Sequence, residues 1–483
     1  MRKLLVIIAL LSLTVCAEAQ NARQEIKKNP RVSASGYLAY PGPQHRLTPA
    51  PKGYKPFYLS HYGRHGSRYL IGTADYDRAY LTLMRADSLG QLTAKGREVR
   101  DKVAQIRQEA MHRDAELTQR GAQQHREIAR RMWERFHEVF EGKTNVDAKS
   151  TVVIRCILSM ENALQELVRL NPQLNITHDA SQHDMYYMNQ DDKVLYKQKM
   201  AGGTKELLDS FKRRHRDDSH MLSLLFRDPN WLGKAKADKL ADRLFKLASN
   251  VQSTELRHQL SLYDIFTDEE LYQHWLCNNA FWYLTYGPST INGGNQPFSQ
   301  RNLLHKIISQ ADSCIALSHP GATLRYGHDT MVMPLVCLLD LNGYGRPVSD
   351  IEQLPAVGWC DYRIFPMACN VQLIFYRRSV DDKDVLVKIL LNEDEARLPI
   401  STDCAPYYHW SDVRRYYLDK LASYKPQPLQ KYPPAHPDNA NRRHVSADMA
   451  AIAVYGPGLL RRGLGGPRRG TYARHRAEHL GKV

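Results

Sequence analysis

Short apolar runs rich in β-branched and aromatic residues recur along the chain and predict β-strands. They occupy residues 56–62, 151–154, 322–326, 371–376 and 385–391. Gly63 and Gly327 end the first and the third of these runs. The last two runs are close enough in sequence to form a hairpin or the edge of a sheet.

Longer segments with apolar residues at helical spacing lie between these runs. We expect helices within residues 81–109, 118–140, 159–170, 204–286 and 331–341. Strand–helix units at both ends therefore flank a mainly helical block. This order predicts an α/β fold with a mostly parallel sheet flanked by helices and an inserted α-helical domain.

The pattern also divides the chain into segments. We expect a signal peptide at residues 1–19, an N-terminal segment at 20–53, the first part of an α/β domain at 54–170, a mainly helical insertion at 171–315, the second part of the α/β domain at 316–425, and a basic tail at 426–483. The tail is rich in Pro, Gly and Arg and has no apolar period, which is typical of disorder.

The first residues are typical of a secretory signal. Arg2 and Lys3 precede an apolar stretch at residues 4–15, and Ala17-Glu18-Ala19 fits the small-residue cleavage pattern. We therefore expect an exported protein that is periplasmic or secreted. Two less favoured alternatives stay open: an uncleaved membrane anchor, and a lipid attached at Cys16.

Composition narrows the class of protein further. With 483 residues, of which 43% are hydrophobic and 24% charged, the chain is globular and long enough for about two to three domains. A mean hydropathy of −0.52 excludes a polytopic membrane protein. Eight cysteines are too few for a disulfide scaffold. Cys360 and Cys369 could pair, or both could be buried and reduced.

The net charge of +16 points to an anionic partner. The tail alone holds ten Lys or Arg and three acidic residues, so about half of the excess lies outside it. Nucleic acid, anionic lipid and a phosphorylated small molecule would all be attracted. We expect a small phosphorylated substrate and no nucleic-acid partner, because a charged tail is more often a solvated extension.

Residues that could carry out catalysis follow three of the predicted strands. Ligands of open α/β sheets bind at this end of the strands. Arg64-His65-Gly66-Ser67-Arg68 follows the first, Arg155 the second and His328-Asp329 the third. An imidazole can attack phosphorus, guanidinium groups match phosphoryl oxygens, and a carboxylic acid can protonate a departing alkoxide. Arg64 and Arg68 flank His65 on one turn, and Gly66 allows close backbone approach.

The run from Arg64 to Arg68 resembles the signature of the histidine acid phosphatases, branch two of the histidine phosphatase superfamily, which includes phytases and multiple inositol polyphosphate phosphatases. Residues 117–121 with Gln124, residues 155–159 and residues 324–330 resemble further segments of that family. The resemblance extends over roughly residues 54–424.

The resemblance implies a role for each matching residue. His65 is expected to be the nucleophile, and Asp329 the acid that protonates the leaving group and then the base that activates water. The residues expected to hold the phosphate are Arg64, Arg68, Arg155 and His328. The family needs no metal and no cofactor.

Two positions depart from the family pattern. Leu70 stands where the signature often has Pro, a residue without chemistry. Asp329 directly after His328 resembles phytases and acid phosphatases, whereas the multiple inositol type usually has His-Ala-Glu. The chain length, the expected export and the Arg-Cys-Ile segment resemble bacterial members grouped with the multiple inositol type. We expect a phosphomonoesterase, with inositol polyphosphates such as phytate as the preferred substrate class.

Other classes of function compete with this interpretation. A broad-specificity acid phosphatase would use the same residues, and a non-catalytic anion-binding protein would need the arginines but neither His65 nor Asp329. A zinc hydrolase is disfavoured because His61 and His65 lie on a strand and loop, with no Glu after His61. His61, His319 and Tyr326 outside the motifs are expected to be structural, although His61 lies near the signature.

Overall fold

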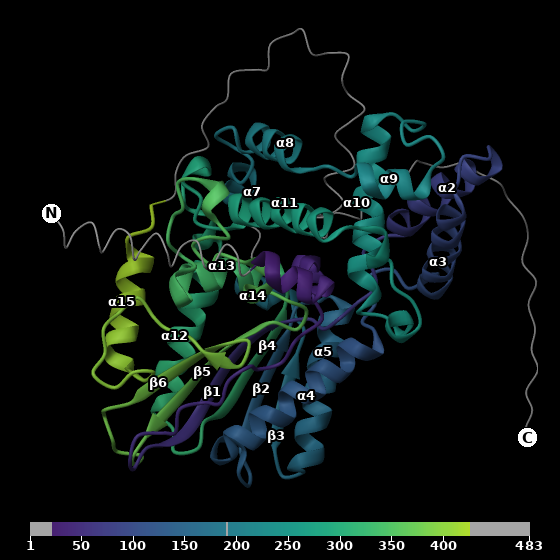
Figure 1. The fold of residues 1–483 in the computed structure, drawn as a ribbon. Coiled ribbons are helices and arrows are strands. Elements are labelled where there is room, and N and C mark those ends of the chain that lie inside the picture. The colour runs from purple at the N-terminus through teal and green to yellow at the C-terminus, as the bar shows by residue number, and fades with distance from the viewer. Residues whose placement is uncertain (1–21, 190–191, 426–483) are drawn as a thin grey trace, which may run out of the picture. The chain divides into compact units, whose positions relative to one another are not determined.

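The computed structural model describes residues 22–189 and 192–425, and within them eight strands form one sheet (Figure 1). The predicted signal peptide and basic tail lie outside the described residues. The strands are β1 (Lys55–Arg64), β2 (Asn145–Ser150), β3 (Asn175–Asp179), β4 (Gly321–Gly327), β5 (Asn370–Arg377), β6 (Leu386–Leu391), β7 (Asp394–Glu395) and β8 (Tyr408–His409). The predicted α/β class is confirmed.

The sheet is mixed, and not mostly parallel as expected, with the order β3-β2-β4-β1-β5-β6-β7 and β8 paired to β6. Pairing is parallel from β3 through β2 and β4 to β1, and antiparallel from β1 through β5 to β6. The runs expected to form a hairpin or an edge are β5 and β6. They do pair with each other, but β5 lies inside the sheet between β1 and β6.

Helices cover both faces of the sheet and form a further layer beyond one end of it (Figure 1). Their bounds are α2 (Ala74–Ser88), α3 (Ala94–Ala110), α4 (Gln119–Arg135), α5 (Ile154–Leu170), α6 (Met185–Met188), α7 (Lys193–Gln198), α8 (Thr204–His215), α9 (Ser219–Leu225), α10 (Lys234–Val251), α11 (Asp268–Tyr286), α12 (Arg301–Ile315), α13 (Asp329–Leu339), α14 (Asp361–Ile364) and α15 (Trp410–Ala422). No helix in the described residues is both long and apolar enough to cross a membrane.

Side chains of β1 alternate between two apolar cores, one on each face of the sheet. Tyr58 and Tyr62 enter the core shared with α13 and the helical layer, and Leu59 enters the core beneath α4 and α5. Because successive side chains of a strand point to opposite faces, one central strand serves both cores. The segment predicted to be mainly helical, residues 171–315, also contributes β3 to the sheet.

Two predicted elements differ in the structure. The strand predicted at residues 151–154 is wrong: β2 ends at Ser150, and Val152 and Ile154 are exposed. The β-branched residues there lead into α5 instead, because strand preference is weaker than tertiary context. The single helix expected at 81–109 is broken, since Thr93 caps a new helix by accepting a hydrogen bond from the Gly96 N–H.

Gly321, the first residue of β4, has no space for a side chain. This residue has φ +71°, and a Cβ there would lie 1.9 Å from the carbonyl oxygen of Asn145. Gly142 has a similar φ of +62°, but an added Cβ would have nothing within 4 Å.

We predict that Gly321→Ala destabilises the protein by about 1–3 kcal/mol more than Gly142→Ala. Both variants pay the same backbone cost, so the difference isolates the collision between β4 and β2. Thermal unfolding of the two variants measures it. Equal melting temperatures would contradict the packing described here.

Candidate active site

The register between β1 and β4 sets the position of the site. The two strands run parallel, with Arg64 paired to Gly327 as the last residue of each. The N–H of His65 then donates to the carbonyl of Gly327 at 2.9 Å. His65 directly follows β1 and His328 directly follows β4, so the two side chains lie next to each other. Their ring centroids lie 5.7 Å apart.

The structure brings together all six residues singled out in the sequence. Arg64 Nη2 lies 2.6 Å from Asp329 Oδ2, across the same pair of strand ends. Asp329 is the first residue of α13, and Arg155 lies in the first turn of α5. The charge of Arg155 acts on His65, His328 and Asp329, and Arg68 completes the group after the signature loop. The six members are Arg64, His65, Arg68, Arg155, His328 and Asp329.

The signature loop is held rigidly at Ser67. Gln124 accepts from the Ser67 N–H at 2.8 Å and donates to its hydroxyl at 3.0 Å. Thr118 donates to the Ser67 carbonyl through both its N–H and its hydroxyl. Thr118 and Gln124 both lie in a segment that resembles the family. Through these hydrogen bonds they fix the backbone between His65 and Arg68.

Two glycines allow this loop to lie directly on α4. A Cβ on Gly66 would lie 2.4 Å from the carbonyl oxygen of Gly121, and a Cβ on Gly121 would lie 2.2 Å from that of Ser67. The Gly66 N–H also donates to the hydroxyl of Ser159 on α5. Backbone contact on this scale excludes any larger residue at either glycine.

His65 is uncharged and has a defined tautomer. Burial, and then the charges of Arg155, Arg64 and Arg68, hold its pKa well below the ordinary value of 6.5. Its Nδ1 lies 2.9 Å from the carbonyl oxygen of Gly66, so Nδ1 carries the proton and donates it there. The lone pair is therefore on Nε2. Burial and Arg155 likewise lower the pKa of His328 to about 3.

The guanidinium groups have unused hydrogen-bonding capacity. The Nε atoms of Arg64, Arg68 and Arg155 are buried and have no hydrogen-bond partner within the described part of the chain. A buried donor without an acceptor is costly, so the cluster favours an anion among the three side chains. Asp329 is the carboxylate that faces them, and it is paired with Arg64.

Asp329 is ionised in this state. Burial raises its pKa, but Arg64 and Arg68 outweigh burial and hold the pKa below its usual value. An anion bound among the arginines would weaken this effect, because it would compete with Asp329 for the same cations. The protonation of Asp329 is thus coupled to occupancy of the site.

Several residues near the site carry no signal in the sequence. Tyr37, from the N-terminal segment, lies beneath the guanidinium of Arg68 at 5.4 Å. Asn250, from α10, donates to the Arg68 carbonyl at 2.9 Å. Both reach the signature from parts of the chain without a motif, so only the fold reveals them. His61 is buried against Tyr326 behind the signature, where burial lowers its pKa to about 3.

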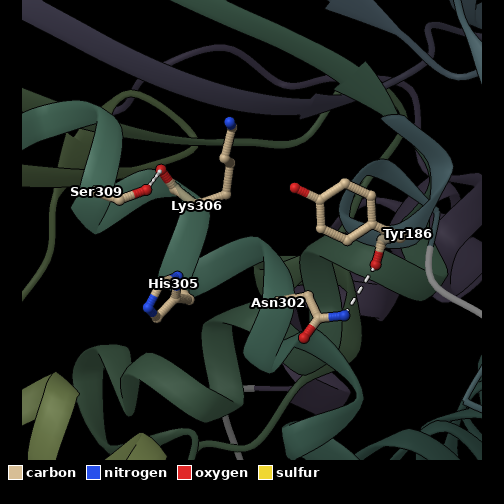
Figure 2. A pocket seen from close by; sticks show the side chains of 5 residues that line it. All are labelled: Tyr186, Asn302, His305, Lys306 and Ser309. Carbon is tan, nitrogen blue, oxygen red and sulfur yellow. Dashed lines mark hydrogen bonds between the residues drawn. The ribbon is translucent and has the colours of Figure 1, made fainter. Parts of the chain in front are cut away.

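A separate hollow of about 260 Å³ lies between α6 and α12 (Figure 2). It is lined by Tyr186, Asn302, His305, Lys306 and Ser309. None of the six predicted residues lines it, so it is distinct from the cluster around His65.

The cysteines within the described residues are unpaired. Cys360 and Cys369 are both buried, and neither forms a disulfide. The other cysteines within the described residues form no disulfide either. Of the two alternatives for this pair, the structure has the reduced one.

Comparison with known families identifies the class. A model of the histidine phosphatase superfamily (branch 2) matches residues 64–392, well over half of the chain. The protein belongs to this superfamily. No curated protein sequence matches the chain.

Solved structures share the fold at low identity. The multiple inositol polyphosphate phosphatase of Bifidobacterium longum in complex with phosphate is 19% identical, with a TM-score of 0.66 over 80% of this chain and 97% of that one. Its complex with inositol hexasulfate gives 18% identity and a TM-score of 0.63 over 79% and 96%. The phytase from D. castellii is 16% identical, with a TM-score of 0.59 over 81% and 85%. At these identities the likeness establishes the fold alone.

We predict that Arg155→Met weakens binding of inorganic phosphate by about 10- to 100-fold, because it removes a charged donor from the cluster. Arg169→Met, at the exposed end of the same helix, is the control and should bind as the wild type does. Isothermal calorimetry with phosphate measures both. Equal affinity for all three proteins would place the anion elsewhere.

Proposed function

We propose that the protein is an exported, metal-independent phosphomonoesterase that acts through a phosphohistidine intermediate. The observation that carries the proposal is a buried, neutral imidazole among three guanidinium groups whose Nε donors have no hydrogen-bond partner among residues 22–189 and 192–425. Membership in the histidine phosphatase superfamily supports it. Export rests on the signal-like pattern of the first nineteen residues.

In the first step the phosphate group lies among Arg64, Arg68 and Arg155, with His328 as a further contact. The lone pair on Nε2 of His65 attacks phosphorus, and the bond from phosphorus to the ester oxygen breaks. Asp329, protonated once the substrate dianion occupies the arginines, gives its proton to the departing alkoxide. The product is an alcohol and a phosphorylated His65.

In the second step Asp329 acts as a base. Its carboxylate takes a proton from water while the water oxygen attacks phosphorus. The bond to His65 breaks, its electron pair returns to Nε2, and inorganic phosphate leaves. The arginines stabilise the charge of the phosphoryl oxygens in both steps.

We propose inositol polyphosphates such as phytate as the substrate class. The support is structural likeness to a multiple inositol polyphosphate phosphatase and a phytase, together with a net charge of +16 that attracts polyanions. A panel of phosphomonoesters with phytate, resolved by product position, tests this. Equal kcat/KM for phytate and simple aryl phosphates would instead indicate a broad-specificity acid phosphatase.

We predict that His65→Ala abolishes hydrolysis of an aryl phosphate. Asp329→Asn should lower kcat by about 10²–10⁴ while inorganic phosphate still binds, because the amide cannot donate the proton. The exposed His319→Ala is the control and should leave activity intact. Turnover by His65→Ala would overturn the role of His65 as the nucleophile. Wild-type protein that binds phosphate without turnover would indicate a non-catalytic anion-binding protein.

We predict an acidic to near-neutral pH optimum. A nucleophile with a lowered pKa stays neutral as the pH falls, so kcat/KM should show no acid limb near the ordinary histidine value of 6.5. Activity should decline as the pH rises, because Asp329 must be protonated when the leaving group departs. Initial rates from about pH 4 to about pH 9 measure the profile. A strictly alkaline optimum would be incompatible with these roles.

A further inference from the structure

A second group of reactive side chains precedes α15. The carboxylate of Asp403, the Sγ of Cys404 and a ring nitrogen of His409 lie within 4.8 Å of one another. His409 Nε2 is 3.1 Å from Asp403 Oδ1. The three residues come from one short stretch of chain that ends in β8.

This group lies far from the signature loop. His409 pairs with Leu386 at the start of β6, Leu386 is level with Tyr376 on β5, and Tyr376 is level with Pro56 at the start of β1. His65 follows the other end of β1, which has ten residues. The two groups are therefore roughly 30 Å apart, at opposite ends of the sheet.

The donor set selects a particular kind of metal. A thiolate, an imidazole and a carboxylate are ligands of Zn²⁺, and tetrahedral zinc places its ligand atoms about 3–4 Å from one another. Mg²⁺ and Ca²⁺ prefer oxygen ligands only, so the thiol disfavours them.

A neighbouring carboxylate orients the imidazole. His409 Nδ1 lies 2.6 Å from Asp384 Oδ1, and Asp384 Oδ2 accepts from the hydroxyl of Tyr54 at 2.7 Å. Histidines that bind metals usually donate their second N–H to a carboxylate in this way, which directs the other ring nitrogen at the ion. Here that nitrogen is Nε2, the one that faces Asp403.

The backbone around the ligands is fixed. The Tyr407 N–H donates to the Cys404 carbonyl at 2.9 Å, and the Thr402 hydroxyl donates to the Tyr407 carbonyl at 2.9 Å. The Trp410 N–H donates to the Val385 carbonyl at 2.8 Å. Cys404 and His409 are thus held on a tight turn and on the sheet, and little ordering remains to be done on binding.

We propose that Asp403, Cys404 and His409 bind one Zn²⁺ ion, with Asp384 as the positioning residue behind His409 and water as the fourth ligand. The proton of the Cys404 thiol and any proton on His409 Nε2 are released to solvent as the ion binds, so that the thiolate and the neutral imidazole are the ligands. The ion joins the turn before β8 to the start of α15 and takes no part in phosphoryl transfer.

The test uses the full, tag-free chain, stripped with EDTA and titrated with Zn²⁺ by calorimetry. We expect one ion per chain, and affinity lowered at least about tenfold by Cys404→Ser and by Asp384→Asn. Cys277→Ser, a half-buried cysteine elsewhere, should bind as the wild type does. With Co²⁺ as a probe, the thiolate charge-transfer absorption should be present in wild type and Cys277→Ser and absent in Cys404→Ser.

A second variant covers the case in which Cys404→Ser fails to fold. The Asp403 side chain is 82% exposed, so Asp403→Asn removes a ligand without disturbing packing. It should also weaken zinc binding at least about tenfold. Absence of stoichiometric binding, or binding unchanged by Asp403→Asn and Asp384→Asn, would overturn the proposal.

Discussion

The backbone hydrogen bond from His65 to Gly327 ties the end of β1 to the end of β4, and the candidate site depends on it. It exists because the two strands pair in parallel and finish at the same level. A shift of register by one residue would turn the side chains that follow to opposite faces. The imidazoles of His65 and His328, and the Arg64–Asp329 pair, would then no longer meet. The chemistry is thus set by the pairing of strands that are more than 250 residues apart in sequence.

Around that junction three arginines with buried Nε atoms, Arg64, Arg68 and Arg155, place positive charge where little water can reach it. Like charges repel strongly there, and Asp329 is the one carboxylate among the six residues of the cluster, all of which the structure describes. The neutral state of His65 follows from the same field, since a protonated imidazole would add a fourth positive charge to those of the three arginines. A dianion bound there would relieve the imbalance, accept hydrogen bonds from the unused donors and favour the protonated form of Asp329. In the proposed mechanism, anion binding and activation of Asp329 are thus coupled electrostatically.

The sequence was sufficient for the α/β class and for locating the six residues of the cluster. Arg64, His65, His328 and Asp329 lie at or directly after the ends of β1 and β4, which are β-prone runs, and the family resemblance supported the choice of Arg68 and Arg155. The sequence was insufficient where a feature depends on contacts between segments that are distant in the chain. The β-branched residues 151–153 form the lead into α5 rather than a strand, and this is what places Arg155 in a first turn. The contacts of Tyr37 and Asn250 with Arg68 join distant segments that no local pattern connects.

Gly66 and Gly121 touch through their main chains, so the signature loop and the start of α4 move as one rigid piece. Tyr37 and Asn250, in contrast, reach Arg68 through their side chains, the first by its ring and the second by its amide. For laboratory evolution this separates two kinds of position. Libraries at the glycine contact would sample mostly misfolded chains, whereas libraries at Tyr37 and Asn250 would alter the surroundings of Arg68 and leave the glycine contact itself intact.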